Sequence, residues 1–280
     1  MMRRDPPLSL RSAVDARTLC EQDYCDEIHI LGSFWPYSHK SFESRVVKGF
    51  KECNPITQYQ PHVSQLAEFY FRQIISKIGT QKFEWIVRIL GSAETEPRND
   101  KPMSLLAEKL CRHFNARDCT YLFFRTSARP PMRTIDRLSG NEVLKSRIQY
   151  VCQDLFIKPG ELEGGALLID DIANTGASVR VYAFALKRFA AVESVVAVNL
   201  AVTRFANGRD GRGMLRLNTS ELNALPNLCS VTIDERGVFH LDESCRELSK
   251  AVSVDMKFLA DRRAKPCEKC VFHPSASLFL

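Results

Sequence analysis

The sequence predicts an α/β fold in which helices cover both faces of a parallel, doubly wound sheet. Between residues 82 and 205, short apolar runs of strand length alternate with longer segments whose apolar residues recur at helical spacing. Strands that alternate with helices in this way favour a parallel sheet. A chain of 280 residues has room for one large α/β domain or for one domain with an added module.

Residues 1–80 are predicted to form an N-terminal extension of this sheet. The first 20 or so residues are polar and rich in arginine, so we expect loose order there. Residues 27–35 alternate well enough for a strand, and 41–51 carry a helical apolar stripe. Pro61 begins a further helix that reaches about Ile78, because proline suits the first turn of a helix.

Residues 81–206 are predicted to form the core of the domain. The expected strands are Phe83–Leu90, Thr120–Phe124, Ala166–Ile169 and Val192–Val202. The expected helices are Met103–Phe114 and Ser178–Ala190. Polar segments at 91–102 and 125–141 connect them, and the second is long for a loop.

Residues 207–280 are predicted to form a C-terminal extension. A glycine-rich run at 207–213 indicates a linker. A hairpin is expected over 229–241, then a helix near 243–262 and a tail that carries cysteines.

Composition and charge indicate an ordinary water-soluble protein. The chain is 45% hydrophobic and 26% charged, with a net charge of +6, and its basic residues are mostly interleaved with acidic ones. That balance suits phosphorylated small molecules and tolerates nucleic acid. The N-terminus lacks the apolar run of a secretion signal, and no window has the roughly 18 apolar residues of a membrane span. We therefore expect a cytoplasmic protein whose ten cysteines are mostly reduced.

The segment 166–178, Ala-Leu-Leu-Ile-Asp-Asp-Ile-Ala-Asn-Thr-Gly-Ala-Ser, has the pattern of a phosphate cradle. Four apolar residues place Asp170 and Asp171 at the carboxyl end of a buried strand, where ligands collect in open α/β sheets. Small residues follow, and Gly176 can adopt a positive φ. A helix that starts at about Ser178 directs unpaired N–H groups at the loop, and Thr175 adds a hydroxyl.

A phosphate held in that loop lies about a sugar's width from the two carboxylates. Carboxylates accept hydrogen bonds from vicinal hydroxyls, so the pattern predicts a site for ribose 5-phosphate. The alternative is helix capping alone, with Asp or Thr as the N-cap residue. Because all thirteen positions fit the pattern in its strand–loop–helix context, we favour the binding site.

This segment resembles the 5-phosphoribosyl 1-diphosphate (PRPP) motif of type I phosphoribosyltransferases, and the variant Asp-Asp-Ile-Ala-Asn-Thr-Gly-Ala-Ser is most similar to the ComF branch. The resemblance extends weakly over 27–205. It includes the 27–51 segment, which ends in Lys-Gly-Phe-Lys, and the arginine-rich loop with Arg125, Arg137 and Asn141. It implies a phosphoribosyltransferase core at 81–206, with the N- and C-terminal extensions forming a variable hood.

The resemblance also implies a role for each segment. The substrate is PRPP with Mg²⁺, and Asp170 and Asp171 hold the ribose 2′- and 3′-hydroxyls. Gly91 and Ser92 form the small-residue turn near the pyrophosphate. The 5′-phosphate lies against Ala173, Asn174, Thr175, Gly176, Ala177 and Ser178.

Arginines of the loop after the second core strand are expected to close over the pyrophosphate. The candidates are Arg125, Arg129 and Arg133. They would stabilise charge on the leaving group, while the closed loop excludes water. A solvated connecting loop is the alternative, since Pro130 and Pro131 are unusual in a mobile lid.

Three features depart from the family pattern. Asn174 stands where purine-salvage enzymes have an aspartate, and asparagine cannot act as a general base, so 6-oxopurine salvage is disfavoured. Arg88 precedes Ile-Leu-Gly-Ser, where the ComF branch has Val-Pro-Val. The N-terminal zinc ribbon of that branch, two CxxC pairs, is missing.

Two cysteine pairs near the ends of the chain offer a substitute for that ribbon. Cys20 and Cys25 lie near the start, and Cys267 and Cys270 near the end, followed by His273. Four thiolates could form a structural Zn²⁺ site if the two pairs meet. The alternative is that all four remain reduced thiols.

The sequence thus predicts a phosphoribosyltransferase that transfers 5-phosphoribosyl from PRPP to a nitrogen of a nucleobase-like acceptor and releases pyrophosphate. The alternative is a non-catalytic, ComF-like PRPP-binding factor in DNA uptake or processing. A nucleotide-responsive regulator ranks third, because no helix-turn-helix module is apparent. Nucleic acid and a second copy of the chain remain open as partners, and no membrane association is expected.

Overall fold

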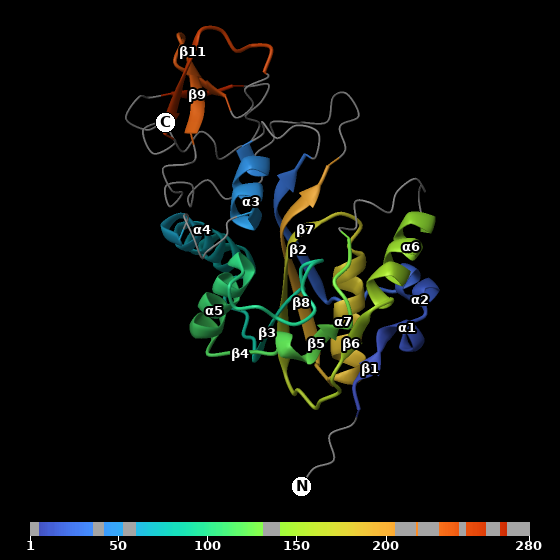
Figure 1. The fold of residues 1–280 in the computed structure, drawn as a ribbon. Coiled ribbons are helices and arrows are strands. Elements are labelled where there is room, and N and C mark those ends of the chain that lie inside the picture. The colour runs from blue at the N-terminus through green and yellow to red at the C-terminus, as the bar shows by residue number, and fades with distance from the viewer. Residues whose placement is uncertain are drawn as a thin grey trace. The chain divides into compact units, whose positions relative to one another are not determined.

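The computed structural model describes residues 6–35, 42–52, 60–130, 141–204, 217, 230–240, 245–255 and 264–267. The chain is a mixed α/β structure with a central sheet of five parallel strands flanked by helices (Figure 1). This confirms the predicted α/β class and the parallel sheet. Contacts divide the chain into a first unit, 1–29 with 80–199, and a second unit, 30–79 with 200–280.

The strand order of the central sheet is β2 (Glu27–Phe34), β8 (Ser194–Thr203), β7 (Gly165–Ala173), β3 (Trp85–Arg88) and β4 (Arg117–Asp118). The short strand β3 pairs in parallel with both β7 and β4. Its register with β7 runs from Trp85 opposite Ala166 to Arg88 opposite Ile169. The carboxyl ends of β3 and β7 therefore lie next to each other.

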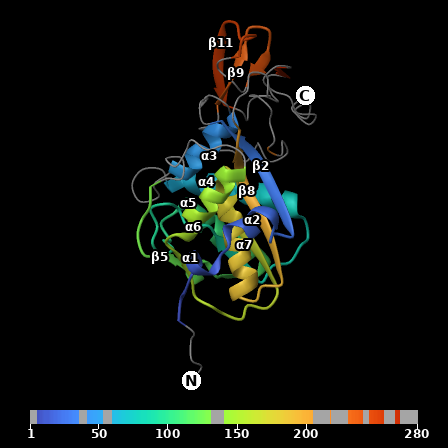
Figure 2. The same ribbon diagram turned by 90° about the vertical axis from the view of Figure 1, so that its right-hand side faces the viewer.

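Helices of the first unit lie on both faces of the sheet. In Figures 1 and 2, α5 (Pro102–Phe114) lies on one face and α7 (Ala177–Phe189) on the other. Helix α6 (Asn141–Cys152) packs on α7, and α2 (Ala16–Glu21) packs on both. These helices and the strands β3, β4 and β7 thus form the layered core of the first unit.

Local sequence explains the ends of α5. Pro102 occupies the first turn, where its missing N–H costs nothing, and Lys101 before it is extended. The apolar residues Met103, Leu106 and Leu110 recur at helical spacing and are buried. Asn115 ends the helix in the left-handed conformation at φ 52°, which asparagine tolerates better than most residues.

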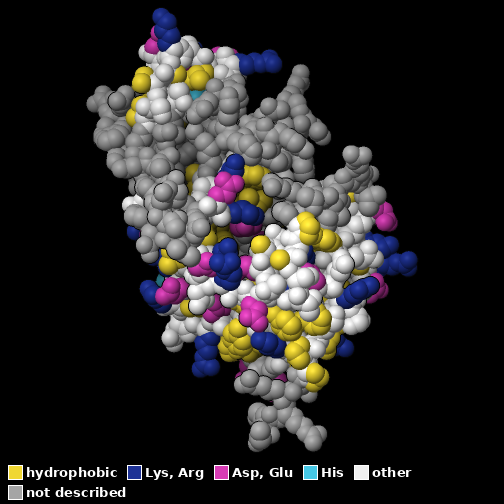
Figure 3. Space-filling view, viewed as in Figure 1, with side chains coloured by type: hydrophobic (Ala, Val, Ile, Leu, Met, Phe, Trp, Pro, Cys, Tyr) yellow, Lys and Arg dark blue, Asp and Glu magenta, His cyan; other side chains and the backbone are white. Residues whose placement is uncertain are grey.

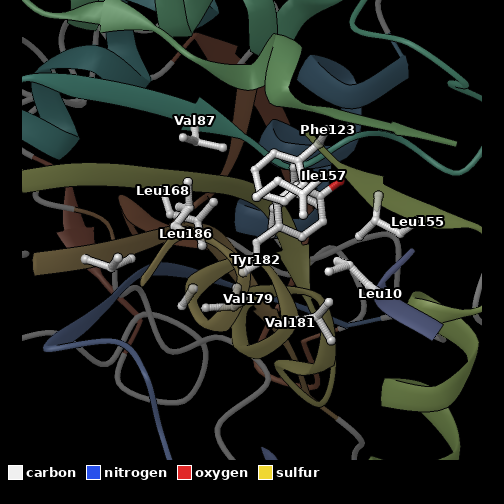
Figure 4. Close-up of a cluster of buried hydrophobic side chains, with 14 of the residues drawn as sticks. Leu10, Val87, Phe123, Leu155, Ile157, Leu168, Val179, Val181, Tyr182 and Leu186 are labelled. Carbon is white, nitrogen blue, oxygen red and sulfur yellow. The ribbon is translucent and has the colours of Figure 1, made fainter. Parts of the chain in front are cut away.

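A buried cluster joins α7 to one face of the sheet (Figure 4). The rings of Tyr182 and Phe123 stack in it, with their centroids 4.2 Å apart. Val87 of β3 and Leu168 of β7 also belong to it. At about 25 cal/mol per Å² of buried apolar surface, each such side chain contributes roughly 1.5–3 kcal/mol to folding.

The N-terminal segment is more ordered than the sequence predicts. It forms β1 (Leu8–Ser9), α1 (Leu10–Ala13) and α2. Leu10 and Leu19 are fully buried in the cluster with α7. The prediction of loose order for the first 20 residues is therefore wrong from Leu8 onward, because a few apolar anchors outweigh the polar composition.

The prediction of a core strand over Thr120–Phe124 is wrong in two ways. Only the last part of the segment is a strand, and that strand does not lie in the central sheet. Thr120–Leu122 is a 3₁₀ turn, and β5 (Phe123–Arg125) follows it. The carboxylate of Asp118 accepts a hydrogen bond of 2.8 Å from the Thr120 N–H, which turns the chain out of the central sheet. Strand β5 instead joins a separate three-stranded sheet with β1 and β6 (Leu155–Ile157).

The described part of the second unit includes two helices and a small sheet, besides parts of β2 and β8. The helices α3 (Phe42–Glu52) and α4 (Gln60–Ile78) confirm the two helices predicted there. The strand order of the sheet is β11 (Ala251–Asp255), β9 (Ser230–Asp234), β10 (Val238–His240) and β12 (Lys265–Pro266).

Two C-terminal predictions meet different outcomes in this sheet. The expected hairpin at 229–241 is confirmed by β9 and β10, which pair in antiparallel fashion. The expected helix near 243–262 is wrong where the structure describes it, because 251–255 form strand β11 against β9. The alternation Ala-Val-Ser-Val-Asp, with two β-branched valines, favours a strand there. The predicted linker at 207–213 lies outside the described residues.

No helix among the described residues has the length and apolar character needed to cross a membrane.

Candidate functional site

The chain reverses its progress across the central sheet between β3 and β7. From β3 it proceeds to the neighbouring β4, and from β7 it proceeds to β8 on the opposite side. Ligands of open α/β sheets bind at such a switch point, outside the carboxyl ends of the two strands. The Gly91–Ser92 turn follows β3, and segment 170–178 ends β7 and begins α7. The topology therefore brings together the two backbone segments that the sequence indicated.

The cradle itself is a three-residue loop, Asn174–Gly176. Strand β7 extends through Asp170 and Asp171 to Ala173, and α7 begins at Ala177, one residue before the predicted start. Gly176 is the N-cap in the left-handed conformation at φ 77°, and no side chain caps the helix. The first-turn N–H groups of an α-helix have no intrahelical acceptor, so they are available to an anion at this end.

The hydroxyl of Thr175 is the clearest sign of a ligand in the loop. Its Oγ1 atom is buried and has no hydrogen-bond partner among the described residues. Buried polar atoms are satisfied in the great majority of cases, so an unsatisfied one requires an explanation. A phosphate oxygen would supply the missing partner. The loop also has room, since a Cβ built on Gly176 meets nothing within 4 Å.

Asp170 and Asp171 are half-buried at the end of β7. Oδ1 of Asp170 accepts a hydrogen bond of 2.9 Å from the Asp171 N–H, and Oδ1 of Asp171 accepts one of 2.5 Å from the Ile172 N–H. Successive strand side chains point to opposite faces. Leu168 belongs to the cluster with α7, so alternation puts Asp170 on the α7 face and Asp171 on the other.

A buried ion pair shapes the turn after β3. Both terminal nitrogens of Arg88 donate to the carboxylate of Glu94, at 2.9 and 2.8 Å, and the two side chains are 2% and 4% exposed. Glu94 also accepts the N–H groups of Gly91 at 2.6 Å and Arg98 at 3.2 Å. The carboxylate therefore fixes the backbone of the Gly91–Ser92 turn.

The pKa of Glu94 reflects these contacts. Burial alone would raise the pKa of this carboxyl. The hydrogen bonds and charge of Arg88, with the N–H groups of Gly91 and Arg98, outweigh burial and hold the pKa below its ordinary value. Glu94 is therefore ionised at neutral pH. Arg88, which departs from the family pattern, thus has a partner six residues along the chain.

The side chain of Arg125 contacts the backbone of the same turn. Its guanidinium donates to the carbonyl oxygens of Leu90 at 3.1 Å, Gly91 at 2.5 Å and Glu94 at 3.1 Å. The residue is only 3% exposed. In this structure the side chain of Arg125 is therefore buried and hydrogen-bonded to the backbone of the turn, and it does not extend into solvent.

Arg129 also contacts this turn. Its backbone N–H donates to the Ser92 carbonyl at 3.0 Å, and its guanidinium donates to the Tyr150 carbonyl at 3.1 Å and lies 5.1 Å from the centre of the Tyr150 ring. Burial, and then the charge of Arg125, lower the pKa of Arg129. Both arginines thus contact the candidate pyrophosphate turn, whereas Arg133 and Arg137 lie outside the described residues.

A separate cavity of about 790 Å³ lies between the α1–α2 segment and α6. Arg11, Arg17 and Lys145 line it together with Asp15. None of the residues predicted for the site lines this cavity. It is distinct from the switch point.

The structure groups the cysteines differently from the sequence prediction. Cys20 and Cys25 lie in and after α2 of the first unit, and burial raises the pKa of Cys25 to about 12. Cys267 lies in the second unit with His240 and Cys245. Cys270 and His273 lie outside the described residues. No group of three or more ligands among the described residues includes Cys20 or Cys25.

Two features of these sites were missed in the sequence. The Arg88–Glu94 pair had a signal, an arginine at the end of an apolar strand with an acid in the following turn. The pair His240-x4-Cys245, ahead of Cys267, also had a signal in its spacing. In each case, whether the residues meet depends on the shape of a turn between them, and the sequence did not predict that shape.

Lys and Arg side chains alternate with Asp and Glu over the described part of the face in Figure 3. This mixture is typical of a solvated surface.

No protein-family model matches the sequence, and no curated protein matches it.

Proposed function

We propose that this chain binds PRPP as its Mg²⁺ complex at the switch point between β3 and β7. The unsatisfied hydroxyl of Thr175, in a loop that opens onto the N-terminus of α7, carries the proposal. The 5′-phosphate accepts this hydroxyl and the first-turn N–H groups. Asp170 and Asp171, just before the loop, accept the ribose hydroxyls.

In this proposal the pyrophosphate lies against the turn after β3. Ser92 lies in it, and Glu94 and Arg125 hold its backbone. In this proposal Arg125 is a positioning residue that acts through the turn, and Arg129 does the same through Ser92. Mg²⁺ would arrive with PRPP as part of the substrate and would neutralise charge on the pyrophosphate.

The proposed reaction is transfer of 5-phosphoribosyl to a nitrogen of a nucleobase-like acceptor. The bond between ribose C1 and the pyrophosphate oxygen breaks, and its electron pair leaves with the pyrophosphate. The acceptor nitrogen forms the new bond to C1 and loses its proton to solvent. Asn174 cannot take that proton, which is why acceptors other than 6-oxopurines are proposed.

Product analysis tests the transfer. The full chain is incubated with Mg-PRPP and a panel of bases, and pyrophosphate release and new nucleotides are followed by mass spectrometry. The proposal expects one base to give a nucleotide and pyrophosphate in equal amounts, and the Asp170→Asn/Asp171→Asn variant to give neither. Binding of PRPP without a product from any base would contradict transfer and leave binding alone.

The second candidate is a PRPP-binding factor without turnover that acts in DNA uptake or processing. One observation favours it: both described arginines of the candidate lid engage backbone carbonyls. DNA binding at low salt, where phosphate contacts are strongest, discriminates between the two. A duplex that binds weakly at low salt and whose affinity is unaffected by PRPP would argue against this candidate.

A further inference from the structure

The small sheet of the second unit gathers three potential metal ligands. These are the imidazole of His240 and the thiols of Cys245 and Cys267, whose ligand atoms all lie within 4.8 Å of one another. His240 and Cys267 are buried, and Cys245 is half-buried. Imidazole and thiolate are the ligands of structural zinc sites in proteins.

The backbone register brings two of the three together. Strands β10 and β12 pair in parallel, with Phe239 opposite Pro266. Cys267 continues that ladder, since its N–H donates to the Phe239 carbonyl at 3.0 Å. His240 and Cys267, the next residues of the two strands, are therefore neighbours by strand pairing.

The distance between the sulfurs fits a shared metal. The Sγ atoms of Cys245 and Cys267 lie 3.8 Å apart. Two thiolates at about 2.3 Å from one zinc ion, at the tetrahedral angle, are separated by roughly 3.8 Å. A disulfide requires about 2.05 Å. The observed separation matches two ligands of one ion.

The carboxylate of Asp234 lies near the imidazole of His240. Oδ2 of Asp234 lies 3.5 Å from Nε2 of His240, and both side chains are fully buried. Asp234 in turn accepts the N–H groups of Arg236 at 3.0 Å and Val238 at 2.9 Å. Metal-bound histidines typically direct their second ring nitrogen at such a carboxylate, which orients the ring.

Hydrogen bonds also link Asp234 to the turn that begins at Cys245. The guanidinium of Arg236 donates to Asp234 Oδ2 at 2.7 Å and to the Glu247 carbonyl at 2.8 Å. The Leu248 N–H closes this turn on the Cys245 carbonyl at 3.0 Å. A hydrogen-bonded chain therefore links the turn at Cys245 to the carboxylate beside His240.

Few apolar side chains are buried in the described part of this sheet. The buried apolar side chains described in its strands and next to them are Ile233, Phe239, Val254 and Ala264. Small sheets with so little buried apolar surface are commonly stabilised by a metal or by disulfides. In the sequence, Cys270 follows Cys267 at the CxxC spacing that is typical of zinc ligands, and it lies outside the described residues.

We propose that His240, Cys245 and Cys267 bind a structural Zn²⁺ ion. This ligand set differs from the one that the sequence predicted, because it omits Cys20 and Cys25. The ligands come from the end of β10, the turn at Cys245 and the residue after β12, so the ion would hold these three segments of the sheet together.

Metal analysis of the full chain tests the ligand set. Protein purified without chelator is expected to hold about one zinc per chain by elemental mass spectrometry. Cys245→Ser should lose most of that zinc, and the matched variant Cys25→Ser should keep it. Zinc below about a tenth of an equivalent after reconstitution, or loss in Cys25→Ser with retention in Cys245→Ser, would overturn the proposal.

A substitution that preserves ligation guards against mere unfolding. His240→Cys is expected to keep the metal, and with Co²⁺ in place of zinc its thiolate-to-metal absorption should increase, since a thiolate replaces an imidazole. An unchanged Co²⁺ spectrum would exclude His240 as a ligand. An oxidised Cys245–Cys267 disulfide, found by mass spectrometry in metal-replete protein, would also overturn the proposal.

Discussion

At the scale of single residues, one buried atom of the cradle, Oγ1 of Thr175, has no hydrogen-bond partner among the described residues. The hydroxyl of Thr175 is buried without a partner, which normally costs free energy. The sequence predicted this residue as a phosphate ligand from its place in the motif. The burial of its hydroxyl depends on how the loop folds, and this was beyond what spacing can predict.

Thr175→Val therefore separates binding from stability. The isosteric change removes a hydrogen bond to a charged phosphate, so PRPP affinity should fall about 10- to 100-fold. The free energy of unfolding should stay level or increase, because an unsatisfied polar atom is replaced by a methyl group. Calorimetry and thermal melting measure the two quantities. The exposed Thr80→Val is the control, and equal effects in both variants would contradict this role.

The two carboxylates are expected to differ. Alternation along β7 puts Asp170 on the face of α7, where the phosphate loop turns into the helix, and Asp171 on the opposite face. Asp170→Asn should therefore weaken PRPP binding more than Asp171→Asn, by about tenfold, the equivalent of one charged hydrogen bond. Titrations of the two variants measure this ratio, and a larger loss in Asp171→Asn would show that the ribose lies on the other face.

At the scale of elements, the turn after β3 is defined by the Arg88–Glu94 pair. The sequence predicted the strand and a small-residue turn at Gly91 and Ser92. It did not predict that a buried ion pair would fix the turn or that Arg125 would hold it from below, because both depend on contacts between segments. The same limit explains the misplaced strand at 120–124, where the Asp118 carboxylate accepts a hydrogen bond from the Thr120 N–H and the chain leaves the central sheet.

Arg88→Met should destabilise the first unit at neutral pH. It leaves the Glu94 carboxylate buried without its counter-charge, a loss of about 3–5 kcal/mol in the free energy of unfolding. The exposed pair Arg112–Glu108 gives a matched control, and Arg112→Met should cost no more than about 1 kcal/mol. Urea unfolding measures both values.

The pH dependence of that loss has a definite sign. In the native chain the pKa of Glu94 is lowered, so the pair's contribution is complete above the unfolded pKa, about 4.3, and is lost as the pH falls through the folded pKa. In Arg88→Met, burial without the counter-charge raises the pKa of Glu94, so protonation stabilises the variant. Its deficit relative to the native chain should shrink between pH 7 and pH 4, and a deficit that grows would contradict this assignment.

At the scale of the whole molecule, the residues of the two sites belong to different units. The cradle is in 80–199, and the proposed zinc ligands described by the structure are in 200–280. Alternating apolar strands and helices made the central sheet predictable, because periodicity records burial directly. The small C-terminal sheet was only half predicted, since its strands are short and its proposed metal ligands are far apart in the sequence.

Removal of zinc is accordingly expected to act on one unit. Chelation should lower the unfolding temperature of the C-terminal sheet, while the affinity for Mg-PRPP changes less than about twofold. Calorimetric melting and titration of the same chelated sample measure both effects. Loss of PRPP binding together with the metal would contradict the independence of the two sites.

The central claim is that the loop between β7 and α7 binds a phosphorylated ribose. Calorimetric titration of the full chain with Mg-PRPP tests it most directly, beside ribose 5-phosphate and Mg-pyrophosphate. We predict saturable binding of one PRPP per chain with a Kd well below 1 mM, tighter than ribose 5-phosphate and weakened by Thr175→Val but not by Thr80→Val. An absence of binding heat up to about 1 mM Mg-PRPP, at several temperatures, would contradict the account.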